Sequence, residues 1–174
     1  STGDRRLGGV DVRARLASAT ELKLESARTD SRDPLRPEDG DAYVASVTHV
    51  TERVDANVYV RQQDTGFGLG QQSVTEGGTR KYGGEGRWRV SEHVSVRGQA
   101  YRQESLEREA QRVLGEAELR WDAGANSLGA GLRTARDQRE GEARVPLRGE
   151  SDQAFASAAR AFAGGRLMPR ATAE

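Results

Sequence analysis

The feature that most constrains this chain is an alternation, with a period of two, between small apolar and polar residues. In Val54–Arg61 the even positions are valine or alanine, and Asp55, Asn57, Tyr59 and Arg61 lie between them. Successive side chains of a β-strand point to opposite faces of a sheet. The pattern therefore predicts strands that have one apolar and one polar face.

The same alternation, in stronger or weaker form, predicts about ten strands. They cover Gly9–Leu16, Glu21–Glu25, Ala42–Val50, Val54–Arg61, Tyr82–Val90, Val94–Tyr101, Val113–Trp121, Leu128–Arg133, Phe155–Ala161 and Leu167–Ala173. Two segments, Glu104–Leu119 and Ser151–Ala163, are also rich in residues that favour helices, so a helix remains an alternative there. In the first segment, Gly115 interrupts the helical pattern and Val113–Trp121 fits period two better than 3.6, and we favour a strand in both.

The connections between these strands alternate between short and long. The short ones are Ala17–Thr20, Thr51–Arg53, Ser91–His93, Asp122–Asn126 and Ala163–Arg166. The long polar ones are Thr29–Asp41, Gln62–Arg80, Gln103–Gln111 and Thr134–Asp152. Short turns at one end of a sheet and long loops at the other are typical of an up-and-down barrel. We therefore expect an all-β chain, an antiparallel up-and-down meander in which residues 1–174 form a single β-barrel domain or a segment of a larger barrel.

Composition excludes several classes of protein. The 27 basic and 27 acidic residues give a net charge of zero, which argues against a nucleic-acid partner. The absence of cysteine excludes disulfides, thiolate metal sites and cysteine nucleophiles. Isoleucine is also absent, and the apolar positions are mostly Gly, Ala and Val, which would fill a soluble core poorly.

These small apolar residues favour a membrane barrel, in which the apolar face points to lipid and the polar face to the lumen. The charged residues that we expect to face the lumen share one parity along the strands. They are Arg13, Arg15, Lys23, Glu25, Asp55, Arg61, Glu85, Arg87, Arg89, Arg97, Glu116, Glu118 and Arg120. Trp88, Trp121 and Phe162 lie beside short turns, where they would form an interfacial aromatic belt.

The hairpins formed by Tyr82–Val90 with Val94–Gln103, and by Gly115–Trp121 with Ser127–Arg133, resemble the outer-membrane β-barrel regions of large Gram-negative surface proteins. This resemblance in hairpin texture covers most of the chain and includes no diagnostic motif. It implies an outer-membrane location, contact with the lipid bilayer, and a transport or surface-display role.

Two departures from that pattern suggest a segment of a larger barrel. The chain ends Ala171–Glu174, without the terminal aromatic residue of such barrels, and Pro169 suits an edge strand. The first short turn would also make the first strand run from the loop end to the turn end. We therefore expect the remaining strands of a larger barrel, or further copies of this chain, as partners.

No residue pattern points to catalysis. His49 and His93 have no ligand or triad partner at a diagnostic spacing, and Gly66–Gly70 lacks the context of a phosphate-binding loop. We expect no catalytic, cofactor or metal site, and thus a non-catalytic pore or surface anchor. Oppositely charged residues on neighbouring strands should form cross-strand ion pairs. The alternative is a soluble antiparallel β-barrel or sheet that binds a ligand or a partner.

Overall fold

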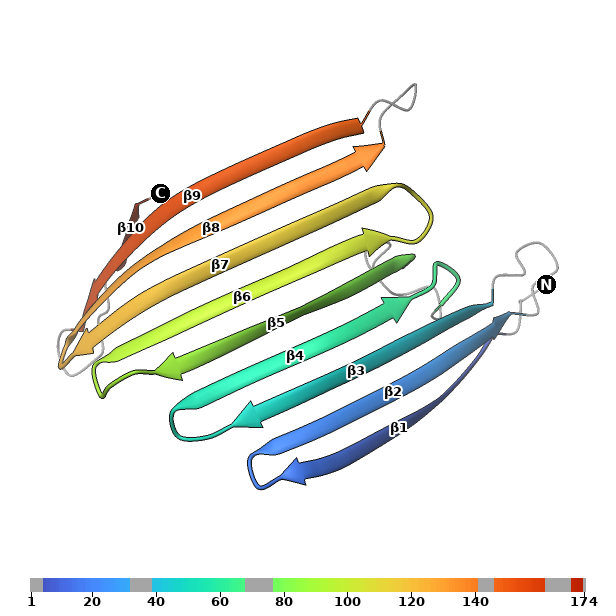
Figure 1. Ribbon diagram of the computed structural model, residues 1–174, viewed down its shortest axis with the longest axis horizontal. Helices are drawn as coiled ribbons and strands as arrows, with labels where there is room; N and C mark the ends of the chain where they lie inside the picture. The colour runs from blue at the N-terminus through green and yellow to red at the C-terminus, as the bar shows by residue number, and fades with distance from the viewer. Residues whose placement is uncertain (1–4, 32–38, 68–76, 141–145, 162–169, 174) are drawn as a thin grey trace.

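The computed structural model describes residues 5–31, 39–67, 77–140, 146–161 and 170–173. Ten strands account for most of them (Figure 1). The strands are β1 Arg5–Ala17, β2 Thr20–Ser31, β3 Gly40–Val50, β4 Val54–Gln63, β5 Thr79–Arg89, β6 Val94–Ser105, β7 Ala110–Ala123, β8 Asn126–Glu140, β9 Pro146–Arg160 and β10 Arg170–Ala173.

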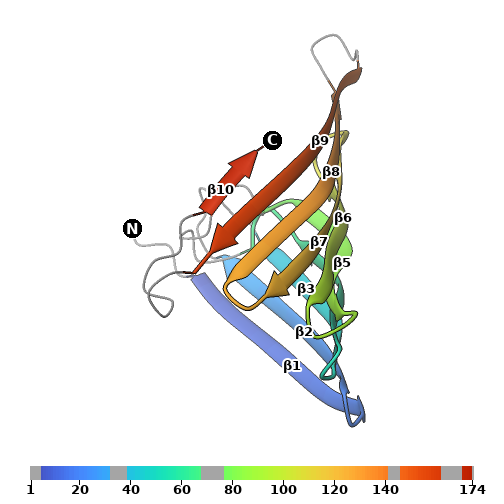
Figure 2. The same cartoon turned by 90° about the vertical axis from the view of Figure 1, so that its left-hand side faces the viewer.

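The strands form one sheet in sequence order, and every neighbouring pair is antiparallel. The predicted all-β up-and-down meander is therefore confirmed. The sheet is not closed into a barrel, because the ordered pairing begins at β1 and ends at β10. It bends into a trough, with β1 and β10 on the same side of the central strands (Figure 2).

Both segments with helical composition are in the sheet. Residues 104–119 lie in β6 and β7, apart from the connection 106–109, and β9 extends to Arg160. Cross-strand pairing on two sides has overridden local helix propensity here. No helix in the part of the chain that the structure describes is long and apolar enough to cross a membrane.

The strands extend beyond the alternating segments at the loop end of the sheet. β8 continues to Glu140 and β9 begins at Pro146, so the expected long connection Thr134–Asp152 is mostly strand. The connection expected at Gln103–Gln111 shortens to residues 106–109 in the same way. Both faces of these extensions are polar, so they lack the alternation that reveals a half-apolar strand.

At the turn end, local polar groups close the hairpins. The Val54 amide donates a hydrogen bond to the Thr51 hydroxyl at 2.9 Å, and the Val94 amide donates one to the Ser91 hydroxyl at 3.1 Å. In the β7–β8 turn, Gly124 has a φ of 57°, which favours glycine over other residues. The turns predicted by the sequence at these positions are thus confirmed.

Candidate functional site

The thirteen charged residues predicted to share a face do so. Strand register joins Asp55 to Arg87, Arg87 to Arg97 and Arg97 to Glu118, so one row of charges crosses β4 to β7. The other nine have the same parity on their strands, and the pairing is in register from β1 to β7. We call this surface the charged face.

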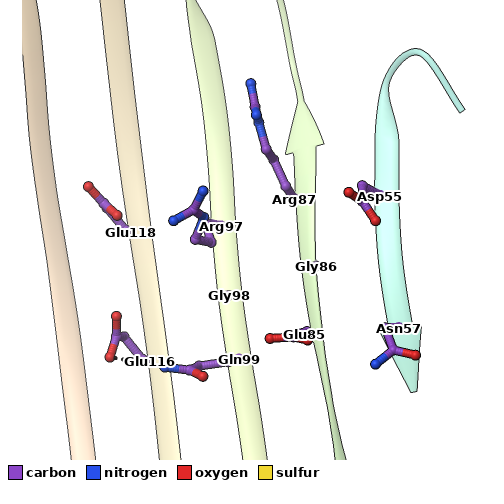
Figure 3. A pocket seen from close by; sticks show the side chains of 10 residues that line it. All are labelled: Asp55, Asn57, Glu85, Gly86, Arg87, Arg97, Gly98, Gln99, Glu116 and Glu118. Carbon is purple, nitrogen blue, oxygen red and sulfur yellow. Dashed lines mark hydrogen bonds between the residues drawn. The ribbon is translucent and has the colours of Figure 1, made fainter. Parts of the chain in front are cut away.

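The charged face is the inner face of the trough. A cavity of about 430 Å³ is hollowed into it over β4 to β7, near the hairpin turns, and we call it the turn-end hollow. Figure 3 shows its polar side chains rising from four neighbouring strands around Gly86 and Gly98. Its charged lining consists of Asp55, Glu85, Arg87, Arg97, Glu116 and Glu118. Within the hollow, the Glu116 side chain is 18% exposed.

Ion pairs connect part of the charged face. Arg133 on β8 reaches Glu116 on β7, with 2.7 Å between Nε and Oε2, as expected for a cross-strand pair. Other pairs run along a single strand, such as Lys23 with Glu25 at 2.6 Å. Residues two apart on a strand share a face, so their side chains compete with cross-strand partners. The expected pairing across strands is therefore found in part.

Two tyrosines interrupt the charges on this face. Tyr59 on β4 and Tyr101 on β6 both pair with Gly83 on β5, so the glycine lies between them. The Lys81 ammonium is 3.8 Å from the centre of the Tyr101 ring, a cation–π contact. Neither tyrosine was predicted as a site residue. Both tyrosines have odd residue numbers in alternating segments, where the neighbouring odd positions are polar or charged. This interruption of the polar positions was the sequence signal that could have identified them.

The opposite face carries a continuous apolar band across β1 to β9. Register aligns its small aliphatic side chains and glycines, for example Leu24 with Ala45 and Ala45 with Val60. The band includes Val10, Val12, Ala14, Leu16, Leu22, Leu24, Ala45, Val47, Val58, Val60, Val96, Ala100, Ala117, Leu119, Leu128, Ala130, Leu132, Ala154 and Ala156.

This band is open to its surroundings. Val10 is 71% exposed, Leu132 is 66% exposed and Val58 is 63% exposed. Among the side chains that the structure describes, no hydrophobic residue is buried. The described residues thus lack the buried apolar core that is usual for a protein in water.

Aromatic residues lie at both ends of the apolar band. Trp88 and Trp121 are at the turn end, on the band's face, where the sequence placed them beside short turns. Tyr43 and Tyr82 are on the same face toward the loop end, and the sequence analysis did not identify this second group. The third predicted aromatic, Phe162, lies outside the described residues.

Beyond the loop-end tyrosines, the face of the band becomes polar. Arg136 on β8 pairs with Glu150 on β9, at 2.9 Å between Nε and Oε1. On β6, Arg102 pairs with Glu104 at 2.8 Å. The apolar band therefore has a sharp boundary, with strands continuing past it into a polar region.

The histidines stabilise strand ends. The Nδ1 atom of His49 is 2.9 Å from the Thr20 hydroxyl, and Nδ1 of His93 donates to the Asp122 carbonyl at 3.0 Å.

Asp122 lies at the turn end, beyond Trp121. Hydrogen bonds from Ser127 and Arg120 to its carboxylate hold the pKa of Asp122 below its usual value. Within the described ranges, no group of three potential metal ligands converges.

The chain was compared with known proteins. No protein-family model matches it, and it has no significant match among curated proteins.

Proposed function

We propose that this chain is a non-catalytic β-barrel segment of the outer membrane of a Gram-negative bacterium, with a pore or surface-anchor role. The observation that supports this proposal best is the exposed apolar band on the outer face of the curved sheet. Val58 in this band is 63% exposed, and the charged residues lie on the opposite, inner face. A membrane barrel requires this arrangement, because its outer face meets lipid and its interior meets water.

The energetics favour lipid as the medium around the apolar band. Contact with water costs about 25 cal/mol for each Å² of apolar surface, and lipid removes that cost. The band combines exposed valines and leucines, such as Val12 and Leu128, with alanines and glycines across nine strands. Trp88, Trp121, Tyr43 and Tyr82 at its two boundaries are the residue types that favour the interfaces of a bilayer.

Insertion into lipid requires partners for the sheet edges. The backbone polar groups of an edge strand have no hydrogen-bonding partner in hydrocarbon, so only a closed barrel can span. We infer that the edges of β1 and β10 are covered by the remaining strands of a larger barrel or by further copies.

The charged face would then line the interior of the barrel. Arg133–Glu116 and Lys23–Glu25 show that its charges neutralise one another, which favours a structural role in a narrow lumen. In a wide barrel the same residues would line a water-filled passage. The mixture of signs argues against strong selection between cations and anions.

Refolding the chain in detergent and in lipid vesicles tests this proposal. We expect a β-sheet spectrum only with detergent or lipid, and a gel mobility that changes on heating. Brominated lipid should quench Trp88 and Trp121, since both lie on the apolar face. A monodisperse protein in plain buffer, quenched by acrylamide equally with and without vesicles, would contradict the proposal.

One measurement favours a second candidate, a soluble sheet that binds a partner through its apolar band. Trp88 lies six positions along the strand from Tyr82, so the band spans about 20 Å along the strand. Outer-membrane barrels have an apolar band about 25 Å tall, and strand tilt shortens this one further. The acrylamide result in the preceding experiment distinguishes the two candidates.

A further inference from the structure

A second and larger cavity lies on the charged face near the loop end. It has a volume of about 740 Å³ and is formed by residues of β5 to β9. We call it the loop-end hollow. Tyr101 lines it, while the turn-end hollow lies on the other side of the tyrosine row and shares none of its residues. A volume of this size accommodates a small organic molecule.

The two hollows differ in charge. The turn-end hollow is lined by four carboxylates and two arginines, so its formal charge is −2. The charged side chains of the loop-end hollow on this face are Arg112, Arg139 and Asp137, so its formal charge is +1. The neutral chain has thus separated its charges along the inner face, with the positive region nearer the loops.

The positive charges of the loop-end hollow are only partly neutralised. Arg112 Nε is 3.6 Å from Asp137 Oδ1. Arg139 makes no ion pair within the part of the chain that the structure describes. The Lys81 ammonium is held against the ring of Tyr101, at the border of the hollow. These groups favour a carboxylate, which a guanidinium binds through two parallel hydrogen bonds.

Uncharged polar groups complete the lining. Thr79 and Ser105 offer hydroxyls, and Gln103 offers an amide that can both donate and accept. Hydroxyls and amides of this kind match the alternating donors and acceptors of a polyol. Apolar surface is contributed by Leu147, Ala110 and the ring of Tyr101.

We propose that the loop-end hollow binds a small polyhydroxylated carboxylate of the sugar-acid class. Arg112 and Arg139 hold its carboxylate, and Thr79, Gln103 and Ser105 bind its hydroxyls. This inference goes beyond the proposed function, because the hollow lies on the charged face and is present whichever medium covers the apolar band.

Titration calorimetry of the full chain, refolded in detergent, tests the proposal with three probes. Gluconate carries both the carboxylate and the hydroxyls, sorbitol lacks the charge, and acetate lacks the polyol. We expect gluconate to bind more tightly than either of the others. No heat of binding from gluconate at millimolar concentration, or equal binding of acetate and gluconate, would overturn the proposal.

Two double variants locate the site. Arg112→Gln with Arg139→Gln should weaken gluconate binding by about tenfold for each arginine lost, the usual effect of removing a charge-assisted hydrogen bond. Arg87→Gln with Arg97→Gln makes the same change in net charge in the turn-end hollow, and it should leave binding within about twofold. Equal weakening by both pairs would show a general charge effect and overturn the site.

A single variant tests the site and leaves the Arg112–Asp137 ion pair intact. Arg139 is exposed and has no described ion-pair partner, so Arg139→Gln should fold normally. It should still weaken gluconate binding about tenfold. Unchanged binding in this variant would contradict the proposal, and heat-modifiable mobility would show independently whether the barrel itself has formed.

Discussion

Gly83 and Tyr101 depend on one another at the scale of single residues. A Cβ added at Gly83 would lie against the Ala100 carbonyl oxygen and 2.6 Å from the Tyr101 Cβ. The aromatic side chain therefore covers the space that a side chain at residue 83 would need, a known way of protecting a glycine within a sheet. Gly131 and Phe155 repeat this arrangement across β8 and β9.

Gly83→Ala should accordingly destabilise the folded chain by about 1–3 kcal/mol, the usual cost of overpacking. Gly98→Ala is the matched control, because its Cβ would meet only the Glu116 carbonyl oxygen at 3.5 Å, an ordinary contact. Urea unfolding of both variants measures the difference. Equal midpoints would show that the close contact between β5 and β6 does not limit stability.

Val58 tests the medium that contacts the apolar face. In lipid, Val58→Arg should cost about 2–4 kcal/mol of unfolding free energy, since a charge would face hydrocarbon near the middle of the band. Asn57→Arg introduces the same charge on the charged face beside Glu85, and it should be nearly neutral. Unfolding in vesicles with urea measures both. If Val58→Arg changed stability by less than about 0.5 kcal/mol, as at a water-exposed site, the lipid contact would be refuted.

At the scale of elements, each strand consists of an alternating segment and, in several cases, a polar extension. β8 continues past Leu132, the last aliphatic residue of its apolar face, to Glu140, and β9 pairs with it from Pro146. The extension is stabilised by backbone hydrogen bonds and by pairs such as Arg136–Glu150. It needs no apolar contact and is suited to water.

Shortening the β8–β9 hairpin should therefore have different effects inside and outside the apolar band. Deletion of Gln138–Arg139 together with Leu147–Arg148 removes two register pairs from the extension, and we expect heat-modifiable mobility to persist. Deletion of Ala130–Gly131 with Phe155–Ala156 removes two register pairs from the apolar band, and it should abolish the heat-modifiable mobility. Gel mobility of both deletion variants in detergent is the measurement. Loss of the heat shift in both would show that the extension is required for folding.

The whole molecule is an ordered sheet with two free edges. β1 runs antiparallel to β10, and within the described ranges each pairs with a neighbour on one side only. The 13-residue edge of β1 and the part of β9 that the four-residue β10 does not cover favour pairing with other strands. The absence of buried hydrophobic side chains among the described residues means that no core compensates for leaving these edges open.

We therefore expect the isolated chain in detergent to associate through its edges. Light scattering after size exclusion should give a protein mass that is a multiple of 18.9 kDa. Edge pairing has this consequence because backbone groups without partners are costly in an apolar medium. A protein mass of 18.9 kDa would instead indicate that β1 and β10 close the sheet within one chain.

The fold class was predictable because a period of two is specific to strands and the turn residues are local. That the thirteen charged residues share one face was predictable for the same reason. Whether a residue is at an odd or an even position of a strand determines the face on which its side chain lies. Strand ends at Glu140 and Pro146 were not predictable, because a strand that is polar on both faces resembles a loop in sequence. The two hollows were also missed, because each combines residues from at least four strands.

The sequence by itself determined the strands, their order along the meander and the division of their residues into two faces. These properties depend on alternation and on short turns, which are local. Only the tertiary structure decided which face is inner and which is outer, because curvature is a property of the whole sheet. Register likewise placed Gly83 between Tyr59 and Tyr101 and separated the basic hollow from the acidic one, since it aligns residues that are distant in the chain.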